Sequence, residues 1–408
     1  MVTNKEQNKL NVPHLRFPEF HGEWEKHGLS EYLDFKNGLN PDSKRFGKGI
    51  KFISVMDILN NPVITYDCIR ASVQATDAEI SSFSVENGDI LFQRSSETLE
   101  DVGRANVYID DRVAVFGGFV IRGKKKANYN PLFFRYLLSS PYARKRIIPM
   151  GAGAQHFNIG QEGLSKVLLN FPSIEEQTKI ASLLHLLDER IATQSKLIED
   201  LKKLKSAIIE NVFDDKHSER LQLDNVGSYI RGLTYSSNDV VEHGGTLVMR
   251  SNNIVNGSLL DYNNNVVFVN KQMSAEQQLQ NGDIVICMAN GSSSLVGKSS
   301  FYDGNWHSPI TVGAFCGIYR SKEPIVKWLF QTNKYRRYIW NSLQGGNGAI
   351  ANLNGEDILN MSFSIPNAPI KDTCVKMLTS VDSALENNIS LCALYTLQKQ
   401  HLLRQMFI

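Results

Sequence analysis

The run most similar to a catalytic motif is glycine-rich and lies at residues 291–299. Its sequence is Gly-Ser-Ser-Ser-Leu-Val-Gly-Lys-Ser, similar to loops that hold nucleotide phosphates with backbone N–H groups and a lysine. Such loops need four residues between the two glycines, whereas this run has five. We therefore interpret Lys298, and the corresponding Arg104 of the N-terminal half, as cations that contact phosphate oxygens. A cryptic enzyme acting at Gly297 and Lys298 remains an alternative.

Other catalytic and metal-binding patterns are missing from the sequence. The nine histidines include no His-x-x-x-His pair, and the five cysteines include no Cys-x-x-Cys pair. There is no Gly-x-Ser-x-Gly elbow, no dinucleotide fingerprint and no tetrapeptide like the Asn-Pro-Pro-Tyr of amino-methyltransferases. We expect no catalytic residue, no metal site and no cofactor on this chain.

Length, composition and cysteine usage indicate a broad class. The 408 residues can form two or more domains, and 42% hydrophobic with 21% charged residues is ordinary for a globular protein. No run approaches the roughly 18 apolar residues that span a membrane, and the polar N-terminus has no apolar signal core. The cysteines are scattered, so we expect a reduced, cytoplasmic protein. The net charge is only +2, but basic runs at 144–146 and 334–337 occupy corresponding places.

The chain is an internal duplication with one constant offset. Asn-Gly-Asp-Ile at 87–90 returns at 281–284, 194 residues later. The same offset relates further places that begin at Gly38, Val102, Asn158, Pro172, Asp188 and Phe213. Each half has a turn-rich part of mixed sequence, which we call a head, followed by a continuous helical pattern. The predicted segments are a lead-in at 1–19, head 1 at 20–172, a helix at 173–213, head 2 at 214–366 and a helix at 367–408.

Both helical segments have the apolar spacing of a coiled coil. Residues 174–213 contain neither Gly nor Pro, and Ser173 and Glu176 fit a capping box at their start. Apolar residues follow alternating steps of four and three, a spacing of 3.5 that is typical of a coiled-coil seam. These seam residues begin with Ile180, Leu184, Leu187 and Ile191 in the first copy, and with Cys374, Leu378, Val381 and Leu385 in the second.

Polar residues occupy the same seam positions in both copies. Gln194 corresponds to Asn388, and Lys205 corresponds to Lys399. Polar seam residues cost stability but fix register and orientation. The pattern predicts that the two helices pair antiparallel within one chain, with the two halves related by a pseudo-two-fold axis. A wet edge at Gln194 and Asn388, or pairing between different chains, is the alternative.

The heads have the pattern of short strands separated by Gly, Asn and Ser turns. Strands are predicted at 50–55 and 246–249, and one helix with aromatic and basic residues at about 132–148 and again at about 327–343. A glycine-rich loop follows each helix. The fold class is therefore α+β, with two homologous mixed α/β heads and a long helix after each.

The heads differ most where their loops carry polar side chains. Gln93-Arg94-Ser95-Ser96-Glu97 corresponds to Cys287-Met288-Ala289-Asn290-Gly291. A repeated scaffold with different loops is typical of two domains that recognise different targets, and Gln, Asn, Arg and Ser match base edges in a DNA major groove. Exposed loops that have simply diverged are the alternative. The candidate DNA contacts are Gln93, Arg94, Ser95, Arg104, Gln155 and Asn158 in head 1, and Arg250, Asn252, Asn290, Lys298, Asn347 and Asn352 in head 2.

The junction between head 1 and its helix resembles a known family. Phe171-Pro172-Ser173-Ile174-Glu175-Glu176-Gln177 and Leu187-Asp188-Glu189-Arg190-Ile191 are similar to the junction and conserved helix of specificity (S) subunits of Type I restriction-modification systems, the HsdS family. Leu15-Arg16-Phe17-Pro18-Glu19-Phe20 also resembles their N-terminal lead-in. The second junction, at 365–371, lacks the Glu-Glu-Gln of the first.

The resemblance implies a non-catalytic subunit that targets DNA. In such subunits each head is a target-recognition domain for one half of an asymmetric, bipartite site in double-stranded DNA. The helices set the unread spacer and dock two methyltransferase (M) subunits, and two motor-nuclease (R) subunits join. Adenine methylation, translocation and cleavage belong to those partners, with S-adenosylmethionine, ATP and Mg²⁺. The alternative is a two-headed coiled-coil scaffold or ligand-binding protein that does not act on DNA.

Overall fold

The computed structural model describes residues 11–214, 219–343 and 351–408. The chain forms two compact units: unit 1 comprises residues 1–195 and 389–408, and unit 2 comprises residues 196–388. The chain leaves unit 1 within helix α7 (Ile174–Val212) and returns within helix α12 (Ala368–Gln405). Each unit therefore contains one head and a part of both helices. The segment boundaries predicted from the sequence stay a prediction, because this division falls inside the two helices.

Head 1 is built around two four-stranded sheets. The first has the strand order β2-β10-β6-β8, with strands β2 (Leu33–Asn37), β10 (Val120–Lys125), β6 (Ile90–Gln93) and β8 (Ala105–Val107). Its neighbouring strands are antiparallel, and every residue of the central strand β6 is buried. The second sheet has the order β4-β3-β9-β5, with β4 (Ser72–Val73), β3 (Phe46–Ile53), β9 (Ala114–Phe116) and β5 (Ser84–Val85). In it β3 and β9 are parallel, with Phe52 opposite Val115.

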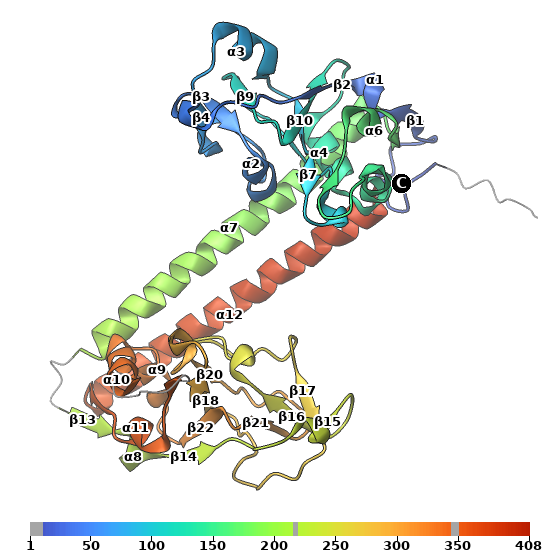
Figure 1. The fold of residues 1–408 in the computed structure, drawn as a ribbon. Coiled ribbons are helices and arrows are strands. Elements are labelled where there is room, and N and C mark those ends of the chain that lie inside the picture. Colours follow the sequence, from blue (N-terminus) through green and yellow to red (C-terminus); the bar gives the residue numbers. More distant parts are fainter. Residues whose placement is uncertain (1–10, 215–218, 344–350) are drawn as a thin grey trace, which may run out of the picture. The chain divides into compact units, whose positions relative to one another are not determined.

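Head 2 repeats this plan. Its first sheet has the order β14-β22-β18-β20, with β14 (Gly227–Arg231), β22 (Cys316–Ser321), β18 (Ile284–Cys287) and β20 (Ser299–Phe301). The second, beside it in Figure 1, has the order β15-β17-β16-β21, with β15 (Val240–Val241), β17 (Val267–Val269), β16 (Thr246–Met249) and β21 (Ile310–Val312). Here β16 is parallel to β21, as β3 is to β9. The predicted correspondence of strands 50–55 and 246–249 is confirmed, although β3 ends at Ile53.

Shorter elements complete each head. Two-stranded pairs join β1 (Glu25–Gly28) to β12 (Leu168–Phe171), β7 (Ser95–Ser96) to β11 (Phe157–Asn158), β13 (Glu219–Gln222) to β24 (Ser362–Ile365) and β19 (Ala289–Asn290) to β23 (Ala351–Asn352). The short helices are α1 (Leu29–Tyr32), α2 (Val55–Asn60), α3 (Asp77–Phe83), α6 (Gln161–Ser165), α8 (Leu223–Val226) and α11 (Gly355–Leu359).

The prediction of a single helix near the end of each head is wrong, because the structure has two shorter helices there in each head. Head 1 has α4 (Pro131–Ser139) and α5 (Pro141–Ile147), and head 2 has α9 (Val326–Leu329) and α10 (Asn333–Leu343). Ser140 restarts the first helix, since its hydroxyl accepts a hydrogen bond from the backbone N–H of Ala143 at 3.2 Å. Thr332 does the same for Tyr335 at 3.0 Å.

The long helices α7 and α12 pair antiparallel, as predicted (Figure 1). In unit 1 the Oγ of Ser195 lies 3.6 Å from the Sγ of Cys392, and earlier residues of α7 meet later residues of α12. Ile180 and Leu184 share a buried cluster with Leu402. In unit 2 Ile209 of α7 shares a buried cluster with Leu378 of α12. The same pairing thus occurs in both units with the two helices exchanged. Of the predicted polar seam residues, Gln194 is buried, and the amide of Asn388 donates to the carbonyl of Ala384 at 2.6 Å.

Each head is completed by the end of the helix from the other half. Phe407, just after α12, lies in the core of head 1, with its ring centroid 5.6 Å from that of Phe133 and 6.4 Å from that of Trp24. Phe213, just after α7, lies in the core of head 2. Phe213 and Phe407 are related by the constant offset, so the exchange follows the internal repeat.

The junction before α7 is only partly as predicted. The hydroxyl of Ser173 accepts a hydrogen bond from the backbone N–H of Glu176 at 3.3 Å, which confirms the N-cap. The Glu176 carboxylate, however, is buried against the lead-in, where it accepts bonds of 2.8 and 2.7 Å from the Arg16 guanidinium. The indole N–H of Trp24 is 3.4 Å away. The capping-box partner is therefore an anchor for residues far away in sequence.

Candidate nucleic-acid interface

The variable loop of each head is closed by the same two backbone hydrogen bonds. In head 1 the N–H of Gln93 donates to the carbonyl of Arg104 at 2.7 Å, and the N–H of Gly103 donates to that of Gln93 at 2.9 Å. In head 2 Cys287 donates to Lys298 at 2.9 Å and Gly297 donates to Cys287 at 2.8 Å. The loops differ in side chains, but their bases are held in the same way.

Glycine is required where each loop closes. Gly103 has φ +67° and Gly297 has φ +82°, a conformation that other residues rarely adopt. A Cβ atom on Gly103 would also lie 2.7 Å from Ile147, and one on Gly297 would lie 2.8 Å from Ile339. The repeated Val-Gly of the sequence therefore marks the point where the loop rejoins the sheet.

The side chains of Gln93 and Cys287 each contact the backbone carbonyl of the residue two positions later. Gln93 is only 5% exposed, and its amide donates to the carbonyl of Ser95 at 2.9 Å. Cys287 is buried, and its thiol lies 3.7 Å from the carbonyl of Ala289, the residue equivalent to Ser95. The structure gives Gln93 a positioning role at the start of the loop. Its predicted contact with DNA stays a prediction.

Beyond this point each head carries a two-stranded ribbon in identical register. In head 1, β7 pairs with β11 so that Ser95 faces Asn158, and the Ser95 hydroxyl donates to the side-chain amide oxygen (Oδ1) of Asn158. In head 2, β19 pairs with β23 so that Ala289 faces Asn352 and Asn290 faces Ala351. The sequence-predicted residues Ser95, Asn158, Asn290 and Asn352 therefore lie on equivalent ribbons. The two asparagines at equivalent positions, Asn158 and Asn352, are both exposed.

The other predicted residues lie around the ribbons. In head 1, half-buried Arg94 donates to the carbonyl of Gly118 at 3.3 Å, and Gln155 is exposed in the loop before β11. In head 2, Arg250 and exposed Asn252 line a pocket of about 440 Å³. Asn347 lies outside the described residues.

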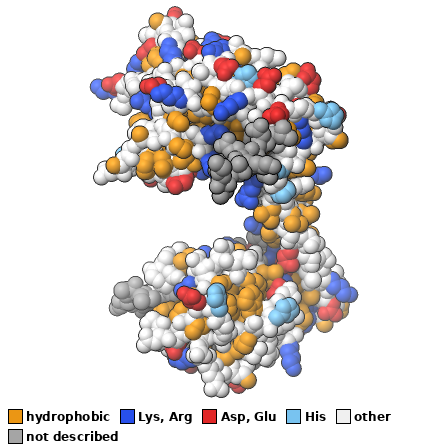
Figure 2. All heavy atoms as spheres, turned by 90° about the vertical axis from the view of Figure 1, so that its right-hand side faces the viewer, with side chains coloured by type: hydrophobic (Ala, Val, Ile, Leu, Met, Phe, Trp, Pro, Cys, Tyr) orange, Lys and Arg blue, Asp and Glu red, His pale blue; other side chains and the backbone are white. Residues whose placement is uncertain are grey.

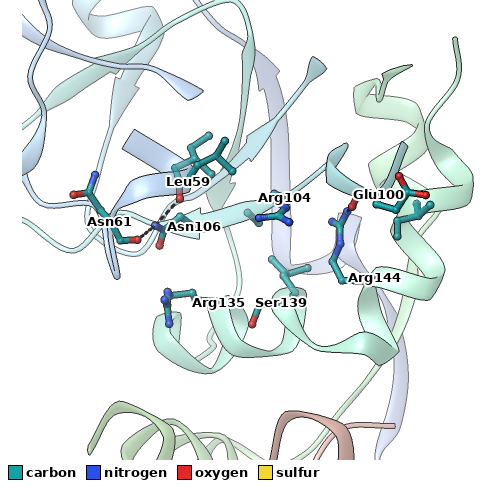
Figure 3. Close-up of a pocket in the computed structure, with 12 residues that line it drawn as sticks. Leu59, Asn61, Glu100, Arg104, Asn106, Arg135, Ser139 and Arg144 are labelled. Carbon is teal, nitrogen blue, oxygen red and sulfur yellow. Dashed lines mark hydrogen bonds between the residues drawn. The ribbon is translucent and has the colours of Figure 1, made fainter. Parts of the chain in front are cut away.

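A cleft of about 410 Å³ in head 1 gathers three guanidinium groups (Figure 3). Arg104 comes from the end of the variable loop, Arg135 from α4 and Arg144 from α5. Arg104 is half exposed and pairs with Asp101 at 2.5 Å. Arg144 holds the carbonyls of Glu100 and Val102 at 2.8 and 2.7 Å. Burial, with a smaller effect of nearby Arg104, lowers the pKa of Arg144 to about 10. The cleft thus contains three guanidinium groups and the Glu100 side chain, and Arg135 pairs with Asp188 at 3.2 Å.

Head 2 has the corresponding cleft, of about 440 Å³. Lys298 stands where Arg104 stands in head 1, and Arg336 of α10 stands where Arg144 stands on α5. Arg144 and Arg336 are equivalent because each lies three residues before an isoleucine that packs against the glycine of the variable loop. Ile147 packs against Gly103 in head 1, and Ile339 packs against Gly297 in head 2. Arg144 and Arg336 were missed as candidates, although the basic runs at 144–146 and 334–337 were the signal. Each cleft is thus lined by a cation from the variable loop and an arginine from a helix.

Lys, Arg, Asp and Glu side chains are interspersed on the face drawn in Figure 2. Within residues 11–214, 219–343 and 351–408, no three His, Cys, Asp or Glu side chains group as metal ligands. In the same ranges no helix has the length and apolar character needed to cross a membrane.

Comparison with known proteins points to one family. The model of the Type I restriction modification DNA specificity domain matches residues 21–203. The chain is 35% identical over 155 residues to the Type I restriction enzyme EcoKI specificity subunit of Escherichia coli, and 34% identical over 153 residues to the StySPI specificity subunit of Salmonella potsdam. Each match covers 36% of this chain and 31% of the relative.

Solved structures share the fold across almost the whole chain. The Type I restriction-modification S subunit from M. genitalium superposes with a TM-score of 0.62 at 14% identity, covering 97% of this chain and 99% of that one. A chain from a structure of the type I R-M system described for its complex assembly gives a TM-score of 0.52 at 13% identity, covering 93% and 96%. Residues 21–203 therefore match the Type I restriction modification DNA specificity domain, and the chain has the fold of solved Type I restriction-modification S subunits.

Proposed function

We propose that the chain is the DNA specificity subunit of a Type I restriction-modification complex, in which each head recognises one half of an asymmetric, bipartite site. The two ribbons carry this proposal. Their register is the same, but Ser95 and Asn158 face each other in head 1 where Ala289 and Asn352 do in head 2. A shared scaffold with different hydrogen-bonding groups is what recognition of two different sequences needs.

The paired clefts support a second, sequence-independent part of the interface. Arg104 and Lys298 are cations from equivalent loops, each in a cleft with an arginine from a helix. Such cations hold phosphates and so fix the register of a protein on the duplex without distinguishing bases. We assign the ribbons to bases and the clefts to phosphates.

The long helices are the proposed spacer and docking surface. An antiparallel pair that bears one head on each half would set the number of unread base pairs between half-sites. We propose that this pair also docks two methyltransferase subunits, that two motor-nuclease subunits join, and that the complex works in the cytoplasm. S-adenosylmethionine, ATP and Mg²⁺ would be used by those subunits, and this chain would supply target choice alone.

Exchanging one head tests the proposal directly. Residues 20–172 are replaced by the corresponding head of another family member, and modified adenines are mapped in the genome with the native chain, the exchanged chain and neither. We expect one half of the methylated motif to change and the other to stay. If the chain is a scaffold or ligand-binding protein that does not act on DNA, the map will be the same in all three strains.

A helix insertion tests the spacer separately. One heptad is added to both α7 and α12, which preserves the seam and lengthens the pair by about 10 Å at 1.5 Å per residue. Since base pairs are about 3.4 Å apart, the spacer should grow by about three base pairs while both half-sites stay unchanged. A longer chain that still methylates the original spacing contradicts the spacer role.

A further inference from the structure

Each head holds one phenylalanine ring in solvent at an equivalent place. Phe119 is 69% exposed and Phe315 is 66% exposed. The first lies in the turn Gly117-Gly118-Phe119 between β9 and β10, and the second in Gly313-Ala314-Phe315 between β21 and β22. One exposed phenylalanine needs no explanation. The same exposed ring in both copies, next to loops that have diverged, requires one.

The turns that carry these rings are closed in the same way. The N–H of Val120 donates to the carbonyl of Gly117 at 2.8 Å, and the N–H of Cys316 donates to that of Gly313, also at 2.8 Å. Each turn follows a buried strand that is held in its sheet by a parallel neighbour. The rings are therefore presented from fixed backbone.

Each phenylalanine is also bonded to the first residue of the variable loop. The carbonyl of Phe119 accepts from the N–H of Arg94 at 2.9 Å. The carbonyl of Phe315 accepts from Met288 at 2.9 Å and from Ala289 of the ribbon at 3.1 Å. In head 2 the same phenylalanine lines the 440 Å³ pocket that contains Arg250. In head 2, Phe315 therefore lines a pocket with Arg250 and Asn252 and is joined to the ribbon through its backbone.

We propose that Phe119 and Phe315 are specificity-determining contacts, each packing its ring against a base of the half-site that the neighbouring ribbon recognises. The inference rests on the proposed function. Duplex DNA is the partner that we propose, because the pocket around Phe315 also contains Arg250 and Asn252, whose side chains match base edges. An apolar ring adds what those polar groups lack, contact with thymine methyl groups and base faces.

The test uses the full chain with its natural partner subunits. Phe119→Ala and Phe315→Ala are made separately, modified adenines are mapped, and affinity for a duplex with the native motif is measured. We expect each variant to relax its own half-site and to weaken binding about 5- to 150-fold, since a good base contact contributes roughly 1–3 kcal/mol. Phe→Tyr at either position should retain the motif. Val113→Ala and Val240→Ala, which shorten exposed apolar side chains elsewhere in the heads, should have no effect.

Each other result has a separate meaning. If both alanine variants keep the native motif and affinity while the unaltered chain directs methylation, the inference is wrong and the proposed function stands. If they impair assembly with the partner subunits but not affinity per assembled complex, the rings are protein contacts and the inference again fails. If the unaltered chain directs no sequence-dependent methylation, the proposed function fails and takes the inference with it. Thermal unfolding of each variant separates loss of contact from loss of fold.

Discussion

Lys205 and Asp382 form a buried ion pair in unit 2, with 2.7 Å between Nζ and Oδ1 and both side chains 8% exposed. Asp188 and Lys399 are the residues that the constant offset relates to Asp382 and Lys205, and they form the equivalent ion pair in unit 1. In each unit the aspartate belongs to the helix that follows the head, and the lysine comes from the other helix. The aspartate also accepts a hydrogen bond from the head. In unit 1 the Tyr136 hydroxyl donates to Asp188 at 2.8 Å, and in unit 2 the indole N–H of Trp328 donates to Asp382 at 3.1 Å.

The pair in unit 2 should contribute strongly to stability. In Lys205→Met the Asp382 carboxylate keeps Lys327, at 2.8 Å, and the indole N–H of Trp328, but loses its buried cation. We expect unit 2 to lose about 3 kcal/mol of unfolding free energy, measured by hydrogen exchange of its peptides, because breaking a buried pair leaves the remaining charge only partly compensated. Lys203→Met removes an exposed pair with Glu199 from the same helix and should cost under about 1 kcal/mol. Equal effects of the two changes would contradict a structural role for the buried pair.

The equivalent pair in unit 1 should give an acid-dependent stability. Burial raises the pKa of Asp188, but hydrogen bonding and charge from Lys399, with Tyr136 and Arg135, outweigh it and lower the pKa below its usual 3.8. A carboxylate whose folded-state pKa is lowered contributes stability that is present above the unfolded value and lost as pH falls through the folded one. Unit 1 should therefore lose stability below about pH 4.

Asp188→Asn isolates that contribution. The variant should be less stable than the native chain at pH 7, and the difference should shrink as pH falls below 4, when the native carboxyl becomes protonated. Urea unfolding at a series of pH values, followed by hydrogen exchange in unit 1, measures it. A stability difference that is constant from pH 7 to pH 3 would mean that the charge of Asp188 is not involved.

Periodicity is the part of this fold that the sequence predicts well. The helices, their antiparallel pairing and the doubled heads all follow from local spacing and from one offset. The partners of the polar seam residues do not follow from spacing, because Lys205 and Lys399 pair with aspartates far away in sequence. Glu176 shows the same limit, since a local capping pattern is overridden by Arg16, 160 residues away.

The sequence also predicts some features of the candidate site and not others. The loops after residues 92 and 286 are identified by their divergence, and the ribbons on them carry Asn158 and Asn352. Burial of Gln93 cannot be inferred from its type, because it depends on a bond to a carbonyl two residues on. Phe119 and Phe315 were missed because an isolated phenylalanine in a sequence predicts core, and only the structure places both in solvent.

The exchanged helix ends predict a coupling between the last residues of each helix and a head they do not precede. Phe407→Ala removes a ring that is 3% exposed in the core of head 1, and should destabilise unit 1 by about 3–5 kcal/mol. Phe213→Ala should do the same in unit 2. Hydrogen exchange resolves the two units, and each change should act only on its own. Leu394→Ala, at a 60% exposed position of α12, is the control and should have little effect.

The clefts predict a change in salt dependence without a change in sequence preference. Arg104→Ala and Lys298→Ala should each weaken binding to all duplexes and reduce the slope of log affinity against log salt by about one. Neither should alter the methylated motif, because phosphates carry no sequence information directly. Asn158→Ala and Asn352→Ala should do the reverse, relaxing one half-site each with the slope retained.

Matched controls test whether the cations in the clefts contact phosphates or only add to the overall charge. Lys166 in head 1 and Lys271 in head 2 are exposed and paired with carboxylates, as Arg104 is, but lie outside the clefts. Their alanine variants should leave the slope unchanged. If the Lys166 and Lys271 variants reduce the slope as much as Arg104→Ala does, the effect of Arg104 on the slope comes from overall charge. The clefts then hold no phosphate. If Arg104→Ala instead alters one position of the motif at constant slope, its guanidinium contacts a base, and the division between ribbon and cleft is wrong.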